Sequence, residues 1–494
     1  MAVSTDPKRR LIFSLLAVAA LAGCGRGNEG ELQVVFIDAP ESLFAGGLRL
    51  SPGAQHLHAA TGAGLVALNV QGEIVPALAD RWIVTDDGRS FIFRLRDGTW
   101  PDGRELTAES VRAQLVERLR ALRGTSLGLD LSPIAEVRAM AGRVVEIRLS
   151  GPVPSLLQLL AQPELALQRG EGGNGEMLLA REGAGALLTM KPPAARGIPE
   201  QSDWQAYVRP IAIRAAAAEQ AVALFDEGEA DVVLGGQIGA LSLADTGPLS
   251  RGTVRLDPAV GLFGLQVRRA DGFLATEQGR EALAMALDRP ALIAPYNIGG
   301  WLPTTRIVAP DLPGDPGLVP ERWAERTIEE LRGVAAARVA AWRRANGGAE
   351  ARLTLAIGRA PGLDVLFAQL ARQLATVGVR IERVAPGRAS DLALVDRVAR
   401  YAEPRWFLNQ FNCSLDNGLC AAEADSLVSE ALAQTDPAAR DNLLARAEAE
   451  LTLANVFIPF GSPLRFSLVR SDVQGFAANP WAFHPLPALA TIPR

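Results

Sequence analysis

The sequence is short of the residue types that metal sites and nucleic-acid surfaces use. Its 494 residues contain three histidines, three cysteines and three tyrosines, and lysine stands only at Lys8 and Lys191. Zinc sites cluster histidine and cysteine, and the one close pair, His56 and His58, has no cysteine nearby, so we expect no metal centre. A formal net charge of −5 leaves no basic face for phosphate contacts, which argues against nucleic acid as a partner.

Signatures of catalysis are missing as well. The sequence shows no nucleophile with a paired base, no phosphate-binding loop and no zinc-hydrolase helix. Carboxylates alone can catalyse reactions, but no pair of them stands out. We therefore expect a binding protein without a cofactor rather than an enzyme.

Long apolar runs are confined to the first residues. Lys8, Arg9 and Arg10 precede an apolar segment, residues 11–22, that is shorter than the ~20 residues a bilayer requires. Small residues then present Cys24, an order that resembles a lipoprotein export signal and implies cleavage after residue 23 and lipidation of Cys24. The alternative is an ordinary secretory leader with a chance cysteine. Either leader places the body outside the cytoplasm, and the lipid would tether it to the inner or the outer membrane.

Removal of this leader changes little else. The net charge falls from −5 to about −7, because three cations and one acid leave with it. The remaining residues 24–494 suffice for two or three lobes with substantial cores, at ~100 to 200 residues per domain.

The two remaining cysteines are Cys413 and Cys420. Disulfides persist in exported proteins, and the sequence between these cysteines contains Asp416, Asn417 and Gly418, which favour a turn. We therefore expect a disulfide that closes a short loop. A metal pair is the alternative, but nothing nearby supplies the third and fourth ligands that zinc requires.

Hairpin and helix signals alternate over residues 64–122. Apolar and basic residues alternate over residues 91–96, and Asp-Gly pairs mark the turns. Thr107 stands where it would cap a helix. The apolar face of this helix would carry Val111, Leu115, Leu119 and Leu122.

This succession resembles the family 5 extracellular solute-binding proteins, the peptide, nickel and opine receptors of ABC importers. The resemblance rests on the order of turn, strand and helix motifs within residues 72–111, with Ser110 where the family usually has Asp. Residues 221–232 and 280–289 resemble later family blocks in the same order, whereas the turn at residues 183–187 fits less well.

The resemblance implies an α/β, periplasmic-binding-protein-like fold of class II, cluster C type, with two principal lobes, a hinge and an extra subdomain in the first lobe. We expect a signal peptide at residues 1–23 and a tether at 24–30. Lobe I would comprise residues 31–255 and 465–490, including the extra subdomain, and lobe II residues 256–464. A strand-helix-strand pattern at residues 353–381 predicts a parallel βαβ unit in lobe II.

Ligand contacts are expected in the loop after the strand at residues 391–395, since ligands of open α/β sheets sit at the carboxyl ends of strands. Family members that take dipeptides carry an Asp here that pairs the peptide's ammonium, and the resemblance places Arg400 at that position. A guanidinium suits a carboxylate or phosphate, so an anionic ligand is expected. The alternatives are a solvated basic turn, or a carboxylate supplied instead by Asp416.

The expected ligand-binding residues extend beyond this loop. Trp481 is placed to close over a ligand, with core packing as the alternative. The full set is Arg397, Arg400, Tyr401, Trp406, Asn409, Asp416 and Trp481.

The function that the resemblance implies is capture of a small peptide-like or anionic solute between the lobes by a membrane-anchored monomer, which delivers the solute to an ABC permease. An envelope lipoprotein that uses this fold for sensing or interaction without transport is the first alternative. A hydrolase of small peptides or esters is the second. Neighbouring permease or ATPase genes would separate the first two possibilities.

Overall fold

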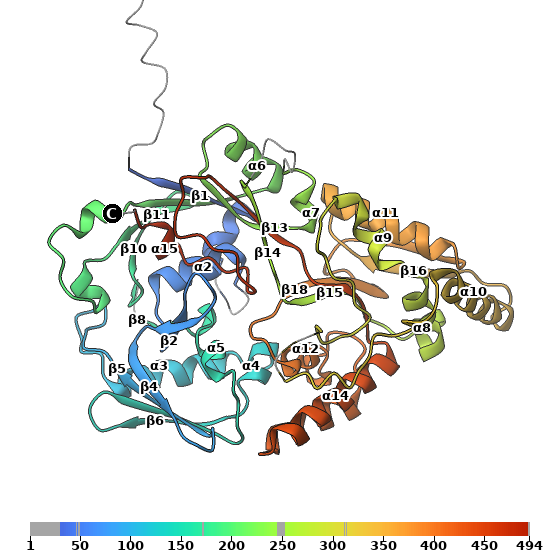
Figure 1. The fold of residues 1–494 in the computed structure, drawn as a ribbon, viewed down its shortest axis with the longest axis horizontal. Coiled ribbons are helices and arrows are strands. Elements are labelled where there is room, and N and C mark those ends of the chain that lie inside the picture. The colour runs from blue at the N-terminus through green and yellow to red at the C-terminus, as the bar shows by residue number, and fades with distance from the viewer. Residues whose placement is uncertain are drawn as a thin grey trace, which may run out of the picture.

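A computed structural model describes residues 30–45, 47, 50–169, 172–244, 252–310, 312 and 314–492 as an α/β protein built on three main sheets. The predicted leader and Cys24 lie outside these residues. Within the described ranges, no helix combines the length and apolar character needed to cross a membrane. Figure 1 shows a seven-stranded sheet beside a five-stranded sheet, with a smaller four-stranded sheet below the first.

The seven-stranded sheet is mixed, and its centre is parallel. Strand β1 is almost wholly buried and pairs in parallel with β12 on one side and β13 on the other. Residues 221–232, which resemble a family block, lead from helix α6 (Ala218–Asp226) into strand β13. In sheet order the strands are β10 (Met177–Glu182), β11 (Gly185–Met190), β12 (Ile211–Ala216), β1 (Leu32–Ile37), β13 (Val232–Gln237), β20 (Arg465–Val469) and β14 (Val254–Asp257). Three helices from distant parts of the chain accompany this sheet: α2 (Pro52–Thr61), α7 (Ile238–Leu241) and α15 (Leu486–Leu489).

The four-stranded sheet forms from the hairpin motifs of the sequence. Thr107 caps helix α3 (Ala108–Ala121) as predicted, and Ser110 completes a reciprocal capping box with it. The Ser110 hydroxyl also accepts a hydrogen bond from the Trp100 indole at 2.9 Å, so the departure from the family's Asp preserves the helix start. The sheet order is β4 (Ala79–Val84), β5 (Ser90–Leu95), β7 (Val144–Leu149) and β6 (Ile134–Met140). Short elements flank it: β2 (Val66–Leu68), β3 (Ile74–Pro76), α4 (Ser126–Asp130), α5 (Leu156–Leu160), β8 (Gln168–Arg169) and β9 (Gly172–Gly173).

The five-stranded sheet contains the βαβ unit that the sequence predicted. Strand β16 pairs in parallel with β17, and helix α11 connects them. Buried leucines at 366, 370 and 374 hold α11 in the core. In sheet order the strands are β17 (Val379–Val384), β16 (Ala351–Ala356), β18 (Leu392–Val398), β15 (Gly261–Val267) and β19 (Phe457–Gly461). The helices are α8 (Glu277–Ala286), α9 (Arg289–Ile293), α10 (Ile328–Ala345), α11 (Pro361–Ala375), α12 (Pro404–Asn409), α13 (Ala422–Ala433) and α14 (Pro437–Ala454).

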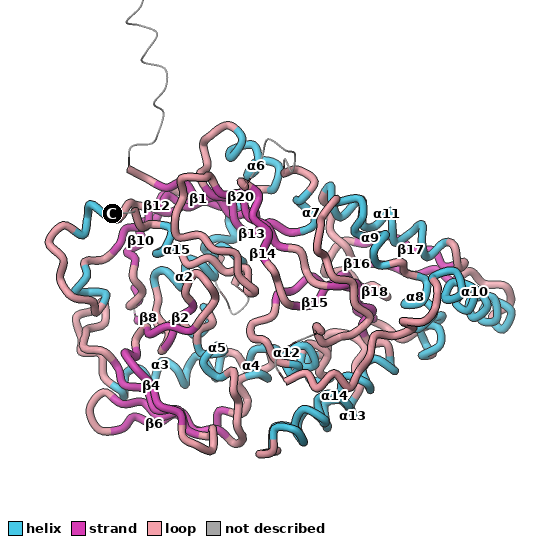
Figure 2. The backbone as a smooth tube through the Cα atoms, viewed as in Figure 1, coloured by secondary structure: helices cyan, strands magenta, loops and turns pink. Residues whose placement is uncertain are grey.

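Two short chain connections join the large sheets. Residues 258–260 lead from β14 to β15, and residues 462–464 lead from β19 back to β20. The packing continues across this boundary elsewhere, because one apolar core extends from the four-stranded sheet into helices α12 to α14. Figure 2 shows α12 beside α4, the contact at which the two parts meet.

Candidate functional site

The loop predicted to bind ligand lies at this meeting point. Strand β18 ends at Val398, and the chain turns into α12, which starts with Pro404 at its first position. Tyr401 and Trp406 are fully or almost fully buried here, at 0% and 2% exposure. The loop is therefore packed against the four-stranded part of the molecule rather than open to solvent.

Asp130, the last residue of α4, is the centre of this contact and was not among the predicted site residues. Its Oδ1 accepts hydrogen bonds from the Tyr401 hydroxyl at 2.9 Å and from the Asn409 amide at 2.7 Å. Its backbone oxygen accepts one from the buried Arg405 guanidinium at 3.1 Å. Burial raises the pKa of Asp130 to about 6, against the opposing effect of Arg405 and the two hydrogen bonds. We call Asp130, Tyr401, Arg405 and Asn409 the junction cluster.

Arg400 is paired within the protein. Its two terminal nitrogens each lie 2.8 Å from an oxygen of the buried Glu164 carboxylate, in a bidentate arrangement. Gln162 adds hydrogen bonds to the guanidinium and to the backbone oxygen of Arg400. Burial opposes the charge, but Glu164 outweighs it, so the pKa of Arg400 is raised. Binding of a ligand anion by Arg400 stays a prediction, and it requires the anion to displace Glu164.

The remaining predicted ligand residues do not converge on one point. Arg397 is exposed and donates to the Gln410 side chain at 3.2 Å. The Asp416 side chain is exposed, and its backbone adopts the left-handed conformation, with φ of 47°. The Trp481 indole donates to the backbone oxygen of Gly72 at 3.0 Å, so this ring packs against the β2–β3 hairpin.

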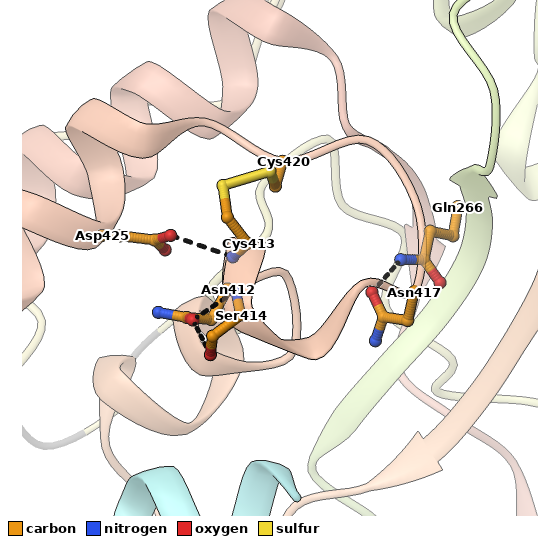
Figure 3. Close-up of a disulfide and its surroundings, with 7 residues drawn as sticks. All are labelled: Gln266, Asn412, Cys413, Ser414, Asn417, Cys420 and Asp425. Atoms are coloured by element: carbon orange, nitrogen blue, oxygen red, sulfur yellow. Dashed lines mark hydrogen bonds between the residues drawn. A yellow bond between two sulfur atoms is a disulfide. The ribbon is translucent and has the colours of Figure 1, made fainter. Parts of the chain in front are cut away.

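The structure contains a disulfide between Cys413 and Cys420. It closes the loop that carries Asp416 (Figure 3). Asp425 accepts a hydrogen bond from the Cys413 backbone at 2.9 Å, and Gln266 donates to Asn417 at 3.1 Å, which fastens the loop to strand β15. The loop is thus held to the C-terminal end of β15, an inner strand of the five-stranded sheet.

A cavity of about 510 Å³ lies beside the chain connections, and sequence reasoning did not find it. Both connections contribute to its wall, together with the loop at residues 298–310. Its charged lining groups already have partners: Asp257 accepts from the Asn479 backbone at 3.0 Å, and Arg306 pairs with Asp315 and Glu448. The larger apolar lining side chains are Leu256, Val260, Leu262, Phe263, Ile298, Trp301, Leu302, Ile307, Leu312, Phe457 and Leu464. We call this space the junction cavity.

The histidine pair has structural contacts. His56 is buried, its Nδ1 lies 2.7 Å from the Pro52 oxygen, and its Nε2 accepts from the His484 backbone at 3.1 Å. Burial lowers the pKa of His56 to about 3, so the ring is neutral. Among the residues that the structure describes, no three or more His, Cys, Asp or Glu side chains are grouped so as to hold a metal ion.

Known proteins match both a segment of the chain and its fold. Residues 73–194 match the family described as bacterial extracellular solute-binding proteins, family 5 Middle. The probable deoxycholate-binding periplasmic protein YgiS of Escherichia coli is 32% identical over a segment covering 21% of this chain. That segment spans only 22% of the length of YgiS.

Solved structures match nearly the whole chain at lower identity. OppA of Haemophilus influenzae, in complex with the peptide RPPGFSPFR, gives a TM-score of 0.79 at 17% identity, covering 94% of this chain and 99% of that one. The murein tripeptide binding protein MppA of Escherichia coli gives 0.76 at 20% identity, covering 92% and 97%. For the unliganded open form of MppA the TM-score is only 0.62 at 19% identity, with coverage of 93% of this chain and 96% of that one.

These matches settle the class of fold. The mixed sheets and the TM-scores confirm the predicted class II periplasmic-binding-protein fold. Residues 73–194 are thus similar to the family 5 extracellular solute-binding proteins, and the described chain shares the fold of the solved structures named above.

Proposed function

We propose that the chain is an extracytoplasmic solute-binding protein that captures a small solute with a largely apolar body in the junction cavity and delivers it to an ABC permease. The observation that carries this proposal is that both connections between the large sheets line one apolar cavity. A ligand in contact with both connections binds differently when the sheets change their relative position. Such differential affinity is what a ligand needs to favour one arrangement of the lobes.

The relatives support a solute-binding role but differ in what their names say they bind. The OppA structure contains a bound peptide, MppA is named for a murein tripeptide, and YgiS is named for deoxycholate, whose steroid body is apolar. The cavity of about 510 Å³ falls in the usual range of about 300 to 1,000 Å³ for small-molecule sites. Because its charged lining groups are paired internally, the wall favours apolar contacts over recognition of a charge.

The division into lobes is part of the proposal. Lobe I, predicted as residues 31–255 and 465–490, would hold the seven- and four-stranded sheets, with strand β14 running two residues past this bound to Asp257. Lobe II, predicted as residues 256–464, would hold the five-stranded sheet. The hinge would then be the two connections at residues 258–260 and 462–464. The packed contact at α12, together with the lower match to open MppA, favours a closed arrangement of the lobes.

A calorimetric titration tests the site with a matched pair of variants. Leu302 lines the cavity and is 70% exposed, while Leu318 is 57% exposed and outside the cavity. The probes are deoxycholate and a tripeptide. For whichever probe binds, Leu302→Glu should lower the affinity by about tenfold or more, because it puts a charge against an apolar wall. Leu318→Glu should leave the affinity unchanged.

Three other outcomes would contradict the proposed function. Equal affinities in the two variants would place the site elsewhere. Turnover of the probe, lost on substitution of a carboxylate, would favour the hydrolase. Binding without probe uptake in cells that contain the neighbouring permease would favour sensing.

The anchor is a separate part of the proposal. Cys24→Ser should release the protein from membranes without a change in thermal stability, since a lipid anchor is chemically separate from the folded cores. Fractionation of cells with a carbonate wash measures this. Retention of the variant in the washed membranes would contradict lipidation at Cys24.

A further inference from the structure

A second cavity, of about 810 Å³, lies away from the junction. Its wall comes from helix α2, from strand β10 at the edge of the seven-stranded sheet and from the loop after β5. The junction cluster and the two chain connections contribute nothing to the part of the wall that the structure describes. We call this space the lobe I cavity.

Two cations of the lobe I cavity face backbone oxygens instead of carboxylates. The Lys191 amine donates to the Gly173 oxygen at 2.9 Å, and the Arg96 guanidinium donates to the Asn174 oxygen at 3.2 Å and to the Arg196 oxygen. Both side chains are half-buried. Among the described residues, neither has a carboxylate within salt-bridge distance, and the nearby Glu176 pairs with Arg196 at 3.3 Å.

The electrostatics of this pair favour an added negative charge. Burial lowers the pKa of Lys191, and the neighbouring Arg96 lowers it further. Burial also lowers the pKa of Arg96, against the opposing effect of the nearby Glu176 carboxylate. The one carboxylate among the described lining residues, Asp97, is exposed and pairs with Arg143. An anion between the two cations would offset the desolvation of both and their mutual repulsion.

The rest of the wall combines apolar side chains with the polar side chains of His58, Thr61, Thr99, Gln168 and Asn174. Five buried apolar side chains line it, and two leucines of edge strand β10 are exposed at its rim, Leu178 at 54% and Leu179 at 44%. A bare inorganic anion would leave this surface in contact with water, and a neutral apolar molecule would leave the cations uncompensated. The buried lining residues are Leu43, Leu57, Trp100, Leu106 and Met177.

We propose that the lobe I cavity is a second binding site, which takes an anionic amphiphile with its head group between Arg96 and Lys191 and its apolar body along the buried leucines, Trp100 and Met177. This site goes beyond the proposed transport site and does not depend on it. Its chemistry also differs, because the junction cavity has paired charges and an apolar wall.

Lys191 can serve as a direct reporter for this site, because the chain contains only one other lysine. In the full chain with Lys8→Arg, Lys191 is the only lysine, so reductive methylation with ¹³C places one side-chain label in the cavity. Decanoate is the probe, and decanol and decyltrimethylammonium are controls with the same chain length. Decanoate below its micelle concentration should shift the Lys191 signal saturably, and the two controls should not.

Calorimetry with variants completes the test. Lys191→Met and Arg96→Met should each lower the affinity for decanoate by about tenfold or more, because each removes a charge-assisted contact. Lys191→Arg keeps the charge and should retain binding. The exposed Arg94, which lies on β5 two residues before Arg96, provides the matched control, and Arg94→Met should bind like wild type. Thermal melting identifies any variant that fails to fold. Lys191→Met then carries the test, because within the described part of the chain the Lys191 amine makes one hydrogen bond.

Three results would overturn the second site. Decanol binding as tightly as decanoate would show that the cations recognise no head group. Decanoate binding with an unmoved Lys191 signal would place the ligand elsewhere. Loss of decanoate binding in Leu302→Glu, with full binding in Lys191→Met, would assign the amphiphile to the junction cavity.

Discussion

Two buried charge clusters differ in how completely their groups are paired. Inside the five-stranded part, Arg306 binds Asp315 at 2.7 Å and Glu448 at 2.8 Å, and Glu448 also accepts from the Val308 backbone. In the junction cluster, Asp130 Oδ2 and one terminal nitrogen of Arg405 have no hydrogen-bond partner within the described part of the chain. The first cluster lies within one body, and the second spans the contact between two.

This difference is what a hinged protein requires. A cluster that never separates gains from full pairing, since each buried charge needs a partner for its lost hydration. A cluster that separates when the lobes open must not hold them too strongly, or a ligand's differential affinity would be too small to shift the equilibrium. In the hinge that we propose, the incomplete pairing at Asp130 would weaken the closed contact, while the Arg400–Glu164 pair would still align it.

The largest effect is expected within the fully paired cluster. Arg306→Met should lower the free energy of unfolding by about 3 to 5 kcal/mol, because it leaves two buried carboxylates without their cation. Urea unfolding measures the loss. Arg148→Met is the control, since Arg148 is half-exposed and lies 3.9 Å from Glu146, and it should change stability by less than about 0.5 kcal/mol. Equal losses in the two variants would remove the distinction between the clusters.

The second prediction concerns the pH dependence of the junction cluster. The pKa of Asp130 is raised from 3.8 to about 6, so between these values the folded protein binds a proton that the unfolded chain has lost. Its contribution is therefore present below about pH 3.8 and lost as the pH rises through 6. At 1.36 kcal/mol per pKa unit the change is about 3 kcal/mol. Asp130→Asn, measured by urea unfolding at each pH, should remove it.

His56 has the opposite effect in an overlapping range, so the comparison must be with wild type at each pH. The pKa of His56 is lowered from 6.5 to about 3, which gives stability that is present above pH 6.5 and lost as the pH falls through 3. This contribution is common to both proteins and cancels in their difference. A pH-independent difference between wild type and Asp130→Asn would contradict the raised pKa of Asp130.

The third prediction separates opening of the lobes from unfolding. Arg400→Met leaves the buried Glu164 carboxylate unpaired, and we expect a loss of about 2 kcal/mol from the closed form. The loss is smaller than for Arg306 because Arg400 is itself 26% exposed and because opening of the lobes returns Glu164 to water. Small-angle scattering should show a larger radius of gyration.

The double variant Arg400→Met/Glu164→Gln controls for the lost charge. It should recover most of the compact form, because no unpaired carboxylate remains. An unchanged radius of gyration in Arg400→Met would show that this pair does not hold the contact. Loss of binding of an anionic solute in Arg400→Met, with Asp416→Ala unaffected, would instead support the ligand role that the sequence predicted for Arg400.

Local signals predicted the fold well because each acts over a few residues. Thr107 caps its helix and residues 353–381 form the βαβ unit, and both patterns are complete within one segment. The site depends on contacts between distant segments. Tyr401 lies 271 positions from Asp130, and Arg400 lies 236 from Glu164, so no spacing rule connects them.

The junction cavity escaped sequence reasoning for the same physical reason. Its wall combines residues near 260, 300 and 460, which meet only after both sheets have formed. No local pattern in residues 298–310 shows that this loop faces the two connections. A pocket formed by separate loops is a property of the fold rather than of any motif.

The smallest expected effect concerns Trp481, for which the sequence left ligand closure and packing open. Its indole hydrogen bond to Gly72 and the close fit of its ring against that glycine favour packing. Trp481→Phe keeps an aromatic ring and loses the hydrogen bond, so we expect a loss of about 1 kcal/mol by thermal melting and an unchanged affinity for the probe that binds the junction cavity. If affinity falls tenfold or more while the melting temperature is unchanged, Trp481 contacts the ligand. The C-terminal segment would then belong to the binding site. The β2–β3 hairpin, which Trp481 contacts, would then lie next to bound ligand, as the junction cavity does.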